Sequence, residues 1–405
     1  MAFYEVSPAE GSRAKLVRTV ELVCFALVVA HLVYLATAYF EHIWLVAPDG
    51  NGLPTDFVDV WAAGKLALAG HAAAAYDWPI HKLAEESAVG HAFDGYFGWH
   101  YPPTFLFVAA GLSLLPYALA NAVWVFGTFP AYVMAIRAII GDRIGFFLAA
   151  AFPAVLANFL VGQNGFLSAG LIGGTLILLD RRPIMAGVLL GLLTYKPHLG
   201  LMFPIALAAG GHWRVFVTAM IVAALMALAS LLAFGAESWQ AFFANIGHTS
   251  HVFLSEGRAD LSKLQTAFGL IRTLGGSEAL AWAVQIVLGL AAAGVIAVLW
   301  RSHAADEIKC AALGTAAMLA TPYLYTYDLV VLAVPLAFLI RLGGKRGFLP
   351  HEVSGIGLSC ALVIIFPFVK EPVGFIAVLV VAALIARRAL AELRSPAAYL
   401  LRSYS

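Results

Sequence analysis

Residues 47–101 read APDGNGLPTDFVDVWAAGKLALAGHAAAAYDWPIHKLAEESAVGHAFDGYFGWHY, and this polar stretch separates the first long apolar run of the chain from the second. It contains five Asp, four His and three Trp. A polar segment of this length between two apolar runs predicts a large loop outside a lipid bilayer. So many ionisable side chains in one loop favour an enzyme that works at a membrane surface.

The rest of the chain is strongly apolar. Of its 405 residues, 62% are hydrophobic and only 12% are charged, whereas about a quarter of the residues of a soluble domain are charged. We therefore expect an all-α polytopic membrane protein with one membrane domain over residues 1–405. The net charge of +1 shows no basic footprint for nucleic acid, so no nucleic-acid partner is predicted.

Apolar runs predict how often the chain crosses the membrane. A bilayer core of about 30 Å needs roughly 20 apolar residues per helix. Basic residues near both ends of the chain place both termini in the cytoplasm. These basic residues are Arg13, Lys15, Arg18, Arg387, Arg388, Arg394 and Arg402. About twelve candidate spans lie at 19–46, 103–118, 119–139, 144–160, 163–180, 184–209, 215–235, 279–300, 308–321, 326–341, 352–368 and 373–391.

Two stretches are predicted outside the cell membrane, at 47–102 and 236–277. The first should contain a helix at 56–69, a turn at Gly70 and a second helix near 78–90. Apolar residues at helical spacing in 56–69 predict that one face lies on the membrane plane. Between 103 and 214, strict alternation of spans would put Arg181 and Arg182 outside. Short hairpins with apices at 163–164 and 196–197 would keep them inside, and the sequence leaves both arrangements open.

Asp56 is the first candidate for chemistry, because it opens the predicted helix at the edge of the bilayer. A carboxylate there has its pKa raised by the surrounding low dielectric, which suits a general base or a partner for a sugar hydroxyl. The competing interpretation is a helix cap that only bonds free backbone N–H groups. Asp59 follows one turn later on nearly the same face, where it could share the work or orient Asp56.

Polar residues next to the later apolar runs are further candidates. His100 and Tyr101 precede two prolines at the start of the second span and could bind a substrate, although aromatic residues there also anchor a helix at the interface. Gln163 and Asn164 interrupt an apolar region. Amides are costly in a membrane and by default face a cavity or a partner.

Lys196 is the only cation inside the run at 184–209. A phosphate is one natural counter-ion for it, with His198 beside it. The alternative is an internal ion pair with a carboxylate such as Asp56 or Asp328, and the sequence favours neither. No His, Asp or Glu spacing predicts a metal site, and no cofactor is expected.

Asp328 opens the span at 326–341 and follows two tyrosines, Tyr325 and Tyr327. An aromatic belt at the interface explains the tyrosines, but it does not explain an acid at the start of a span. Asp328 is therefore a possible second carboxylate, and the tyrosines are possible sugar-binding residues. Arg258, in the second outer stretch, could contact an anionic headgroup or a phosphate, although a solvated loop also accounts for it.

Short motifs in a fixed order resemble the membrane glycosyltransferases of the GT-C fold. More narrowly, they resemble glycosyltransferase family 87, the bacterial polyprenyl-phosphate-mannose-dependent α-mannosyltransferases. The motifs extend over about 300 residues, so their order is more specific than any one of them. They are Asp56-Phe57 with Trp61-Ala62-Ala63-Gly64, Gly70 with Tyr76-Asp77, Tyr101-Pro102-Pro103, Leu115-Pro116 with Trp124, Gly162-Gln163-Asn164, and Ala186-Gly187 with Gly191 and Lys196-Pro197.

This resemblance implies a function and a role for Asp56. The family's catalytic aspartate corresponds to Asp56, which would deprotonate the acceptor hydroxyl while the sugar inverts at its anomeric carbon. The implied donor is a polyprenyl-phosphate sugar, the implied acceptor is a glycolipid or glycan, and the site faces the periplasm from the bacterial inner membrane. Many relatives carry histidine in a late element where this chain has Tyr327-Asp328, so the resemblance leaves the sugar open.

Other functions remain open from the sequence. Arabinofuranose or glucose could replace mannose in the same reaction. A lipid or solute transporter could use Lys196 and Asp328 as an ion-coupled pair, although the chain lacks the repeated halves common in transporters. A non-catalytic subunit of a polysaccharide-assembly complex is a third possibility.

Overall fold

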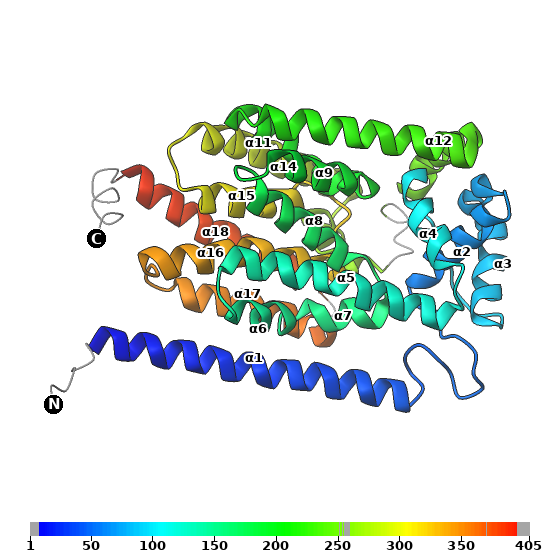
Figure 1. Ribbon diagram of the computed structural model, residues 1–405, viewed down its shortest axis with the longest axis horizontal. Helices are drawn as coiled ribbons and strands as arrows, with labels where there is room; N and C mark the ends of the chain where they lie inside the picture. Colours follow the sequence, from blue (N-terminus) through cyan, green and yellow to red (C-terminus); the bar gives the residue numbers. More distant parts are fainter. Residues whose placement is uncertain (1–7, 251, 253, 255–259, 370, 395–405) are drawn as a thin grey trace.

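The computed structural model describes residues 8–250, 252, 254, 260–369 and 371–394, and these residues form a helical bundle elongated in one direction (Figure 1). The predicted site residue Arg258 and the terminal Arg402 lie outside the described residues. The principal helices are α1 (Pro8–Phe40), α2 (Phe57–Leu68), α3 (Trp78–Val89), α4 (Leu106–Leu112), α5 (Tyr117–Ile140), α6 (Ile144–Ala150), α7 (Ala154–Val161), α8 (Gly165–Leu178), α9 (Pro183–Leu192), α10 (Pro197–Gly200), α11 (Phe203–Gly210), α12 (Trp213–Ser250), α13 (Ala267–Thr273), α14 (Glu278–Arg301), α15 (Asp306–Leu319), α16 (Ala333–Arg346), α17 (Glu352–Val369) and α18 (Val373–Arg394).

Short 3-10 helices connect several of these elements. They are η1 (Ala72–Tyr76), η2 (Pro103–Phe105), η3 (Leu193–Tyr195), η5 (Leu261–Lys263) and η6 (Thr326–Leu332). A 3-10 turn is a common connector between longer helices. Here η3 and η6 adjoin the ends of apolar helices, and polar residues at these two turns lie in one region of the bundle.

Seven helices in the described part of the chain are long and apolar enough to cross a membrane, or eight if the bent pair α6 and α7 counts as one span. The chain is therefore an all-α polytopic membrane protein. The predicted count of twelve stays a prediction, since three of the predicted runs, at 103–118, 163–180 and 184–209, contain only apolar helices of 10–17 residues. These short helices include α8, most of whose side chains pack inside the protein.

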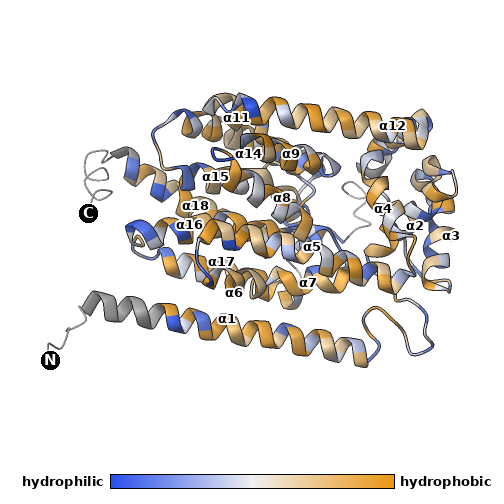
Figure 2. Cartoon of the chain, in the orientation of Figure 1, coloured by the Kyte–Doolittle hydropathy of each residue, from blue (hydrophilic) through white to orange (hydrophobic). Residues whose placement is uncertain are grey.

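Hydrophobic residues occur along the outer helices of the bundle as well as the inner ones, as the hydropathy colours of the ribbon show (Figure 2). Only 11% of the most apolar window is buried in the span Val17–Phe40 and in the span Trp213–Gly247, whereas 78% is buried in Thr326–Arg346. The first two spans therefore present their apolar surface to lipid, and the third forms the centre of the protein. Within α12, Gly235 has φ of 79° and ψ of 163°, and this break marks the start of the second predicted outer stretch.

The two ends of the bundle differ, and we name them by one residue each. The Asp56 end contains α2, α3, α4 and the turns at 163–164, 196–197 and 325–328. The Arg388 end contains the start of α17, the end of α18 and the turn between α8 and α9, and it lies opposite α2 and α3 in Figure 1. Both predicted apices, at 163–164 and 196–197, are breaks between helices, and Arg181 and Arg182 lie at the Arg388 end, as in the hairpin arrangement.

The helices of the first loop form almost where the sequence predicts them. Asp77 caps α3 by accepting a hydrogen bond from the Ile80 backbone N–H at 3.2 Å, and Gly90 ends the helix with φ of 87°. The prediction that α2 lies on the membrane with one face is wrong for its first two turns, because residues 57–64 are all buried. Gly64 permits this packing, since a Cβ there would lie 2.0 Å from the Ala109 carbonyl oxygen of α4.

Candidate active site

Asp56 stands at the N-terminus of α2 without acting as its cap. It is the N-cap residue by position, but its backbone is already helical, and its side chain makes no capping hydrogen bond with the described residues of the helix. The cap interpretation is therefore not supported. The residue is partly exposed.

The surroundings of Asp56 set its proton affinity. Burial raises the pKa of Asp56 to about 6, and the negative charge of Asp328 acts in the same direction. The positive charges of Lys263 and Lys196 and a hydrogen bond with the Gln163 side chain lower the pKa. A general base works best with a pKa near the operating pH. Asp56 is thus ionised at neutral pH but close to the range in which it accepts a proton.

Gln163 reaches Asp56 because the turn between α7 and α8 approaches α2 closely. Gly162 has φ of 72°, and a Cβ there would lie 2.6 Å from Cβ of Phe57. The Gln163 side-chain oxygen accepts hydrogen bonds from the Tyr101 hydroxyl at 3.1 Å and from the Asn164 backbone N–H at 3.3 Å. The Asn164 amide donates to the Tyr101 hydroxyl at 2.6 Å. Gln163, Asn164 and Tyr101, which the sequence singled out separately, therefore form one network.

Lys196 is paired with Asp328. Its Nζ donates to Oδ1 of Asp328 at 2.6 Å, and both side chains are buried. The second oxygen of Asp328 accepts the Tyr325 backbone N–H at 3.2 Å, and Nζ of Lys196 lies 5.1 Å from the centre of the Tyr327 ring. Of the alternatives left open for Lys196, the internal pair with Asp328 is the one that the structure contains.

The sequence interpretation missed Lys263 as a site residue. It ends η5, and the following residue, Leu264, forms an isolated bridge with Tyr325. A hydrogen bond of 2.7 Å from the Gln265 backbone N–H to the Leu324 carbonyl fixes the same contact. Lys263 is exposed, and among the charges that lower the pKa of Asp56 its charge has the largest effect. Nothing in the sequence distinguishes it from a solvated lysine in a loop.

The other predicted residues divide into two groups. Tyr325 and Tyr327 are half-buried, stack with ring centres 5.6 Å apart and lie close enough to Asp56 for its charge to act on both. His198 is half-buried, and the Lys196 charge acts on it. His100 is exposed, lies over Gly98, and its charge acts on His81 of α3. The first group therefore lies near Asp56 or Lys196, and His100 lies near α3.

Asp59 is the second carboxylate of α2, and it is buried. Burial raises the pKa of Asp59 well above its usual range, and the negative charges of Asp56 and Glu85 raise it further. Two adjacent carboxylates in a low dielectric do not both ionise. Asp59 therefore favours its protonated form more strongly than Asp56 does, which makes Asp56 the better base.

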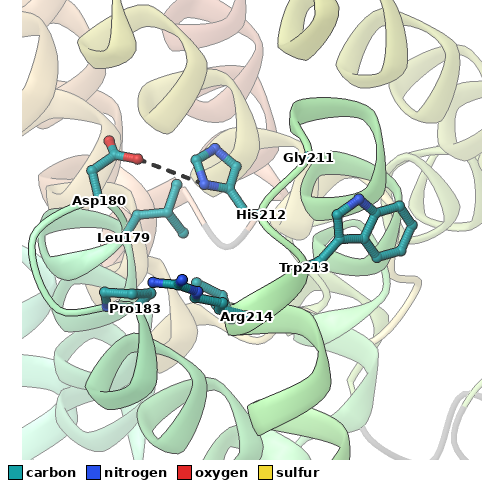
Figure 3. Close-up of a pocket in the computed structure, with 8 residues that line it drawn as sticks. Leu179, Asp180, Pro183, Gly211, His212, Trp213 and Arg214 are labelled. Atoms are coloured by element: carbon teal, nitrogen blue, oxygen red, sulfur yellow. Dashed lines mark ion pairs between the residues drawn. The ribbon is translucent and has the colours of Figure 1, made fainter.

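The described part of the chain also has a pocket of about 360 Å³ at the Arg388 end (Figure 3). Its lining includes Asp180, Pro183 and Arg214, and Asp180 lies 3.6 Å from the His212 ring nitrogen. The pocket is located where α8 ends and α9 begins, whereas Asn164 and Lys196 flank the opposite ends of these two helices. This pocket is therefore separate from the candidate active site.

Metal-binding groups are not apparent at either end, since no cluster of three or more His, Cys, Asp or Glu side chains within the described ranges could hold a metal ion. The candidate site is thus built from one ionised carboxylate, an amide and tyrosine network, a buried ion pair and one exposed cation. Such a set can accept a proton from a hydroxyl and stabilise an anion.

The sequence model of glycosyltransferase family 87 matches residues 99–322, which is more than half of the chain. The matched region contains Tyr101, Gln163, Asn164, Lys196 and Lys263, and Asp56 precedes it. A search of curated proteins finds no match.

Proposed function

The chain belongs to glycosyltransferase family 87 and is a glycosyltransferase, and we propose that it takes its sugar from a polyprenyl-phosphate donor. The acceptor is a hydroxyl of a lipid-linked or glycan-linked sugar, and mannose is the first candidate for the transferred sugar. The reaction takes place on the periplasmic side of the bacterial inner membrane, at the Asp56 end. A donor with a long apolar tail suits an enzyme whose helices expose so much apolar surface to lipid.

Asp56 acts as the general base in this proposal. Its carboxylate removes the proton of the acceptor hydroxyl while that oxygen attacks the anomeric carbon of the donor. The bond between the anomeric carbon and the phosphate oxygen breaks, the sugar inverts, and polyprenyl phosphate leaves with the electron pair. The observation that carries the proposal is the state of Asp56. This residue is partly exposed and its side chain does not cap α2. Burial raises its pKa to about 6, although the charges of two lysines lower it.

Lys263 is the cation that we assign to the donor phosphate. The leaving group is already an anion, so a positioned positive charge is enough to stabilise it. Lys263 is exposed and its charge lowers the pKa of Asp56, whereas the charge of Lys196 is balanced by Asp328 at 2.6 Å. Lys196 and Asp328 then stabilise the buried part of the site, and Tyr325 and Tyr327 can bind the sugar.

Another polyprenyl-phosphate sugar is the alternative within the same reaction class. The sequence has Tyr327-Asp328 where many relatives carry histidine, and Asp328 forms an ion pair with Lys196. Arabinofuranose and glucose donors therefore belong in any test beside mannose. A transporter is disfavoured, because the matched family is one of glycosyltransferases.

The test uses the full chain in nanodiscs with a panel of polyprenyl-phosphate sugars and a glycolipid acceptor, and it measures released polyprenyl phosphate. We expect transfer from one donor, and we expect Asp56→Asn to lower kcat about 10²–10⁴-fold, as the loss of a general base does. Asp94→Asn is the matched control, because Asp94 is an exposed acid of the same loop. Transfer at the normal rate by Asp56→Asn would remove Asp56 from the mechanism.

A further inference from the structure

The pocket of about 360 Å³ at the Arg388 end is formed by two turns, one between α8 and α9 and one between α11 and α12. Leu179, Asp180 and Pro183 line it from the first turn, and residues 211–215 line it from the second turn and the start of α12. Cavities of about 300–1,000 Å³ are typical of sites for small molecules. The volume is therefore sufficient for a polar group such as a lipid headgroup.

Packing against α14 fixes the second turn. Gly211 has φ of 75°, and the backbone N–H of His212 donates to the Leu207 carbonyl at 2.8 Å. The His212 ring lies edge-on to the Trp300 ring with centres 5.6 Å apart. A Cβ on Gly210 would lie 2.8 Å from the same tryptophan ring. The wall of the pocket is therefore built by the protein itself and does not depend on a ligand.

The side chains around the pocket carry more positive than negative charge. The two turns and the first residues of α12 contain Arg181, Arg182 and Arg214 but only one acid, Asp180. Oδ1 of Asp180 lies 3.6 Å from Nδ1 of His212. Arg214 lines the pocket, and its side chain forms no ion pair or hydrogen bond with the residues that the structure describes. Arg214 is thus a cation of the pocket that is available to an anion.

The N-termini of two helices add to this charge. In Figure 3 the Arg214 side chain extends toward Pro183, the first residue of α9. The helices α9 and α12 both begin at the pocket and pack closely, since a Cβ on Gly187 would lie 2.8 Å from the Val215 carbonyl oxygen. The N-terminus of a helix carries a partial positive charge. Two such ends beside an arginine make the pocket more favourable for an anion.

An apolar face of α12 begins at the same place. Trp213 is 57% exposed, and Val217, Met220 and Ile221 are also exposed. These positions share one face of a helix, and only 11% of the most apolar window of this span is buried. Tryptophan is enriched where a membrane helix meets the lipid headgroups. The pocket therefore lies at the level of the headgroups, with a lipid-facing surface directly below it.

We propose that this pocket binds the phosphate headgroup of an anionic phospholipid whose acyl chains lie on the exposed face of α12. The Arg214 guanidinium pairs with the phosphate, a contact that can use two parallel hydrogen bonds. Asp180 accepts hydrogen bonds from headgroup hydroxyls, so phosphatidylglycerol is the class of lipid that suits the pocket. A soluble phosphate compound would leave the apolar face unused.

The leaflet follows from the charge of this end of the chain. Basic residues predict that the Arg388 end lies in the cytoplasm, and basic pockets between membrane helices on that side bind the headgroups of anionic lipids. The lipid is therefore drawn from the cytoplasmic leaflet. The site lies at the end of the bundle opposite Asp56, so its test is independent of the proposed function.

Native mass spectrometry of the full chain in detergent tests the site with three probes, namely phosphatidylglycerol, phosphatidylethanolamine and glycerol 1-phosphate. We expect the tightest binding for phosphatidylglycerol. Arg214→Gln should weaken it about fivefold or more, as the loss of one basic side chain at a lipid surface does. Arg143→Gln is the matched control, because Arg143 is an exposed arginine at the start of α6 and does not line the pocket.

Thermal unfolding provides a second measurement. Arg214 is exposed, so Arg214→Gln should unfold at the normal temperature in lipid-free detergent. Added phosphatidylglycerol should stabilise the unaltered chain by mass action and should stabilise Arg214→Gln less.

Three results would overturn the proposal. Equal affinity for phosphatidylethanolamine would show that the pocket does not select an anionic headgroup. Glycerol 1-phosphate that binds as tightly as phosphatidylglycerol would show a site for a soluble phosphate instead of a lipid. Equal loss of lipid binding in Arg143→Gln and Arg214→Gln would show attraction to the general charge of this end and not to the pocket.

Discussion

Buried acids at the two ends of the bundle differ in whether a basic side chain pairs with them. At the Arg388 end, Glu352 is buried and forms an ion pair with Arg388, whose Nε donates to it at 2.6 Å. Glu392 is paired with Arg346 at 2.5 Å, and the half-buried Glu307 with Lys345 at 2.6 Å. At the Asp56 end, Asp59 and Glu85 are also buried. Nζ of Lys82 lies 4.0 Å from Oε2 of Glu85, which is farther than in the pairs of the Arg388 end.

This difference separates structural acids from chemical ones. A buried acid with a base beside it stays charged and fixes the position of its partner, and breaking such a pair is costly. A buried acid without a base holds a proton, and such perturbed groups gather at functional sites. Lys196 and Asp328 resemble the pairs of the Arg388 end although they lie at the Asp56 end, which supports a structural role for this pair.

Stability measurements on two glutamates test the comparison most strongly. Glu352→Gln leaves the buried guanidinium of Arg388 without its counter-charge, and we expect it to lower the free energy of unfolding by about 3–5 kcal/mol. Burial raises the pKa of Glu85 to about 8, so Glu85→Gln replaces one neutral group by another and should cost far less. Thermal unfolding of both variants in the same detergent, followed by tryptophan fluorescence, measures the difference.

The double variant Arg388→Met with Glu352→Leu is the control for this pair. Replacing both partners removes the uncompensated charge, so this variant should recover most of the stability that Glu352→Gln loses. Equal losses for Glu352→Gln and Glu85→Gln would contradict the distinction between the two ends.

The same distinction explains what the sequence could predict. The helices at 57–68 and 78–89 and the breaks at 163–164 and 196–197 follow from apolar spacing, proline and glycine, which act locally. Whether Lys196 pairs with an internal acid, and with which one, is decided by packing between segments more than a hundred residues apart, so the sequence left open both a phosphate and a carboxylate such as Asp56 or Asp328. The exact number of spans also depends on packing, because a short apolar helix inside the bundle has the composition of a span.

Glu85 and Lys263 were missed for a related reason. In the sequence, Glu85 lies in a helix with other charged residues and has the pattern of a solvated face, and only the packing of α2 on α3 buries it. Lys263 lies in a loop, and only the bridge between Leu264 and Tyr325 brings it beside Asp56. Apart from Asp56 and Asp59, the sequence indicated the parts of the site that interrupt apolar runs and missed those in polar surroundings.

Kinetics of Lys263→Gln test which lysine serves the donor. Lys263 is the exposed cation beside Asp56, so we expect its loss to raise the donor KM about tenfold, a difference of about 1.4 kcal/mol in binding, with a smaller change in kcat. Lys65→Gln is the matched control, because Lys65 is an exposed lysine of α2 and should leave the donor KM unchanged. An unchanged donor KM in Lys263→Gln would mean that Lys196, and not Lys263, binds the donor phosphate.

The pH dependence of Lys263→Gln gives the smallest but most specific effect. The base must be ionised to act, so kcat/KM of the unaltered enzyme should rise with pH and level off above the pKa of Asp56, which burial raises to about 6. Lys263 lowers that pKa, so its removal should move the rising limb to higher pH. Because Lys263 is exposed, salt screens its charge, with a Debye length of about 3 Å at 1 M ionic strength. The displacement should therefore be clear in dilute buffer and nearly vanish at high salt. A limb that moves to lower pH, or one that moves equally at both ionic strengths, would mean that Lys263 does not act on Asp56 through its charge.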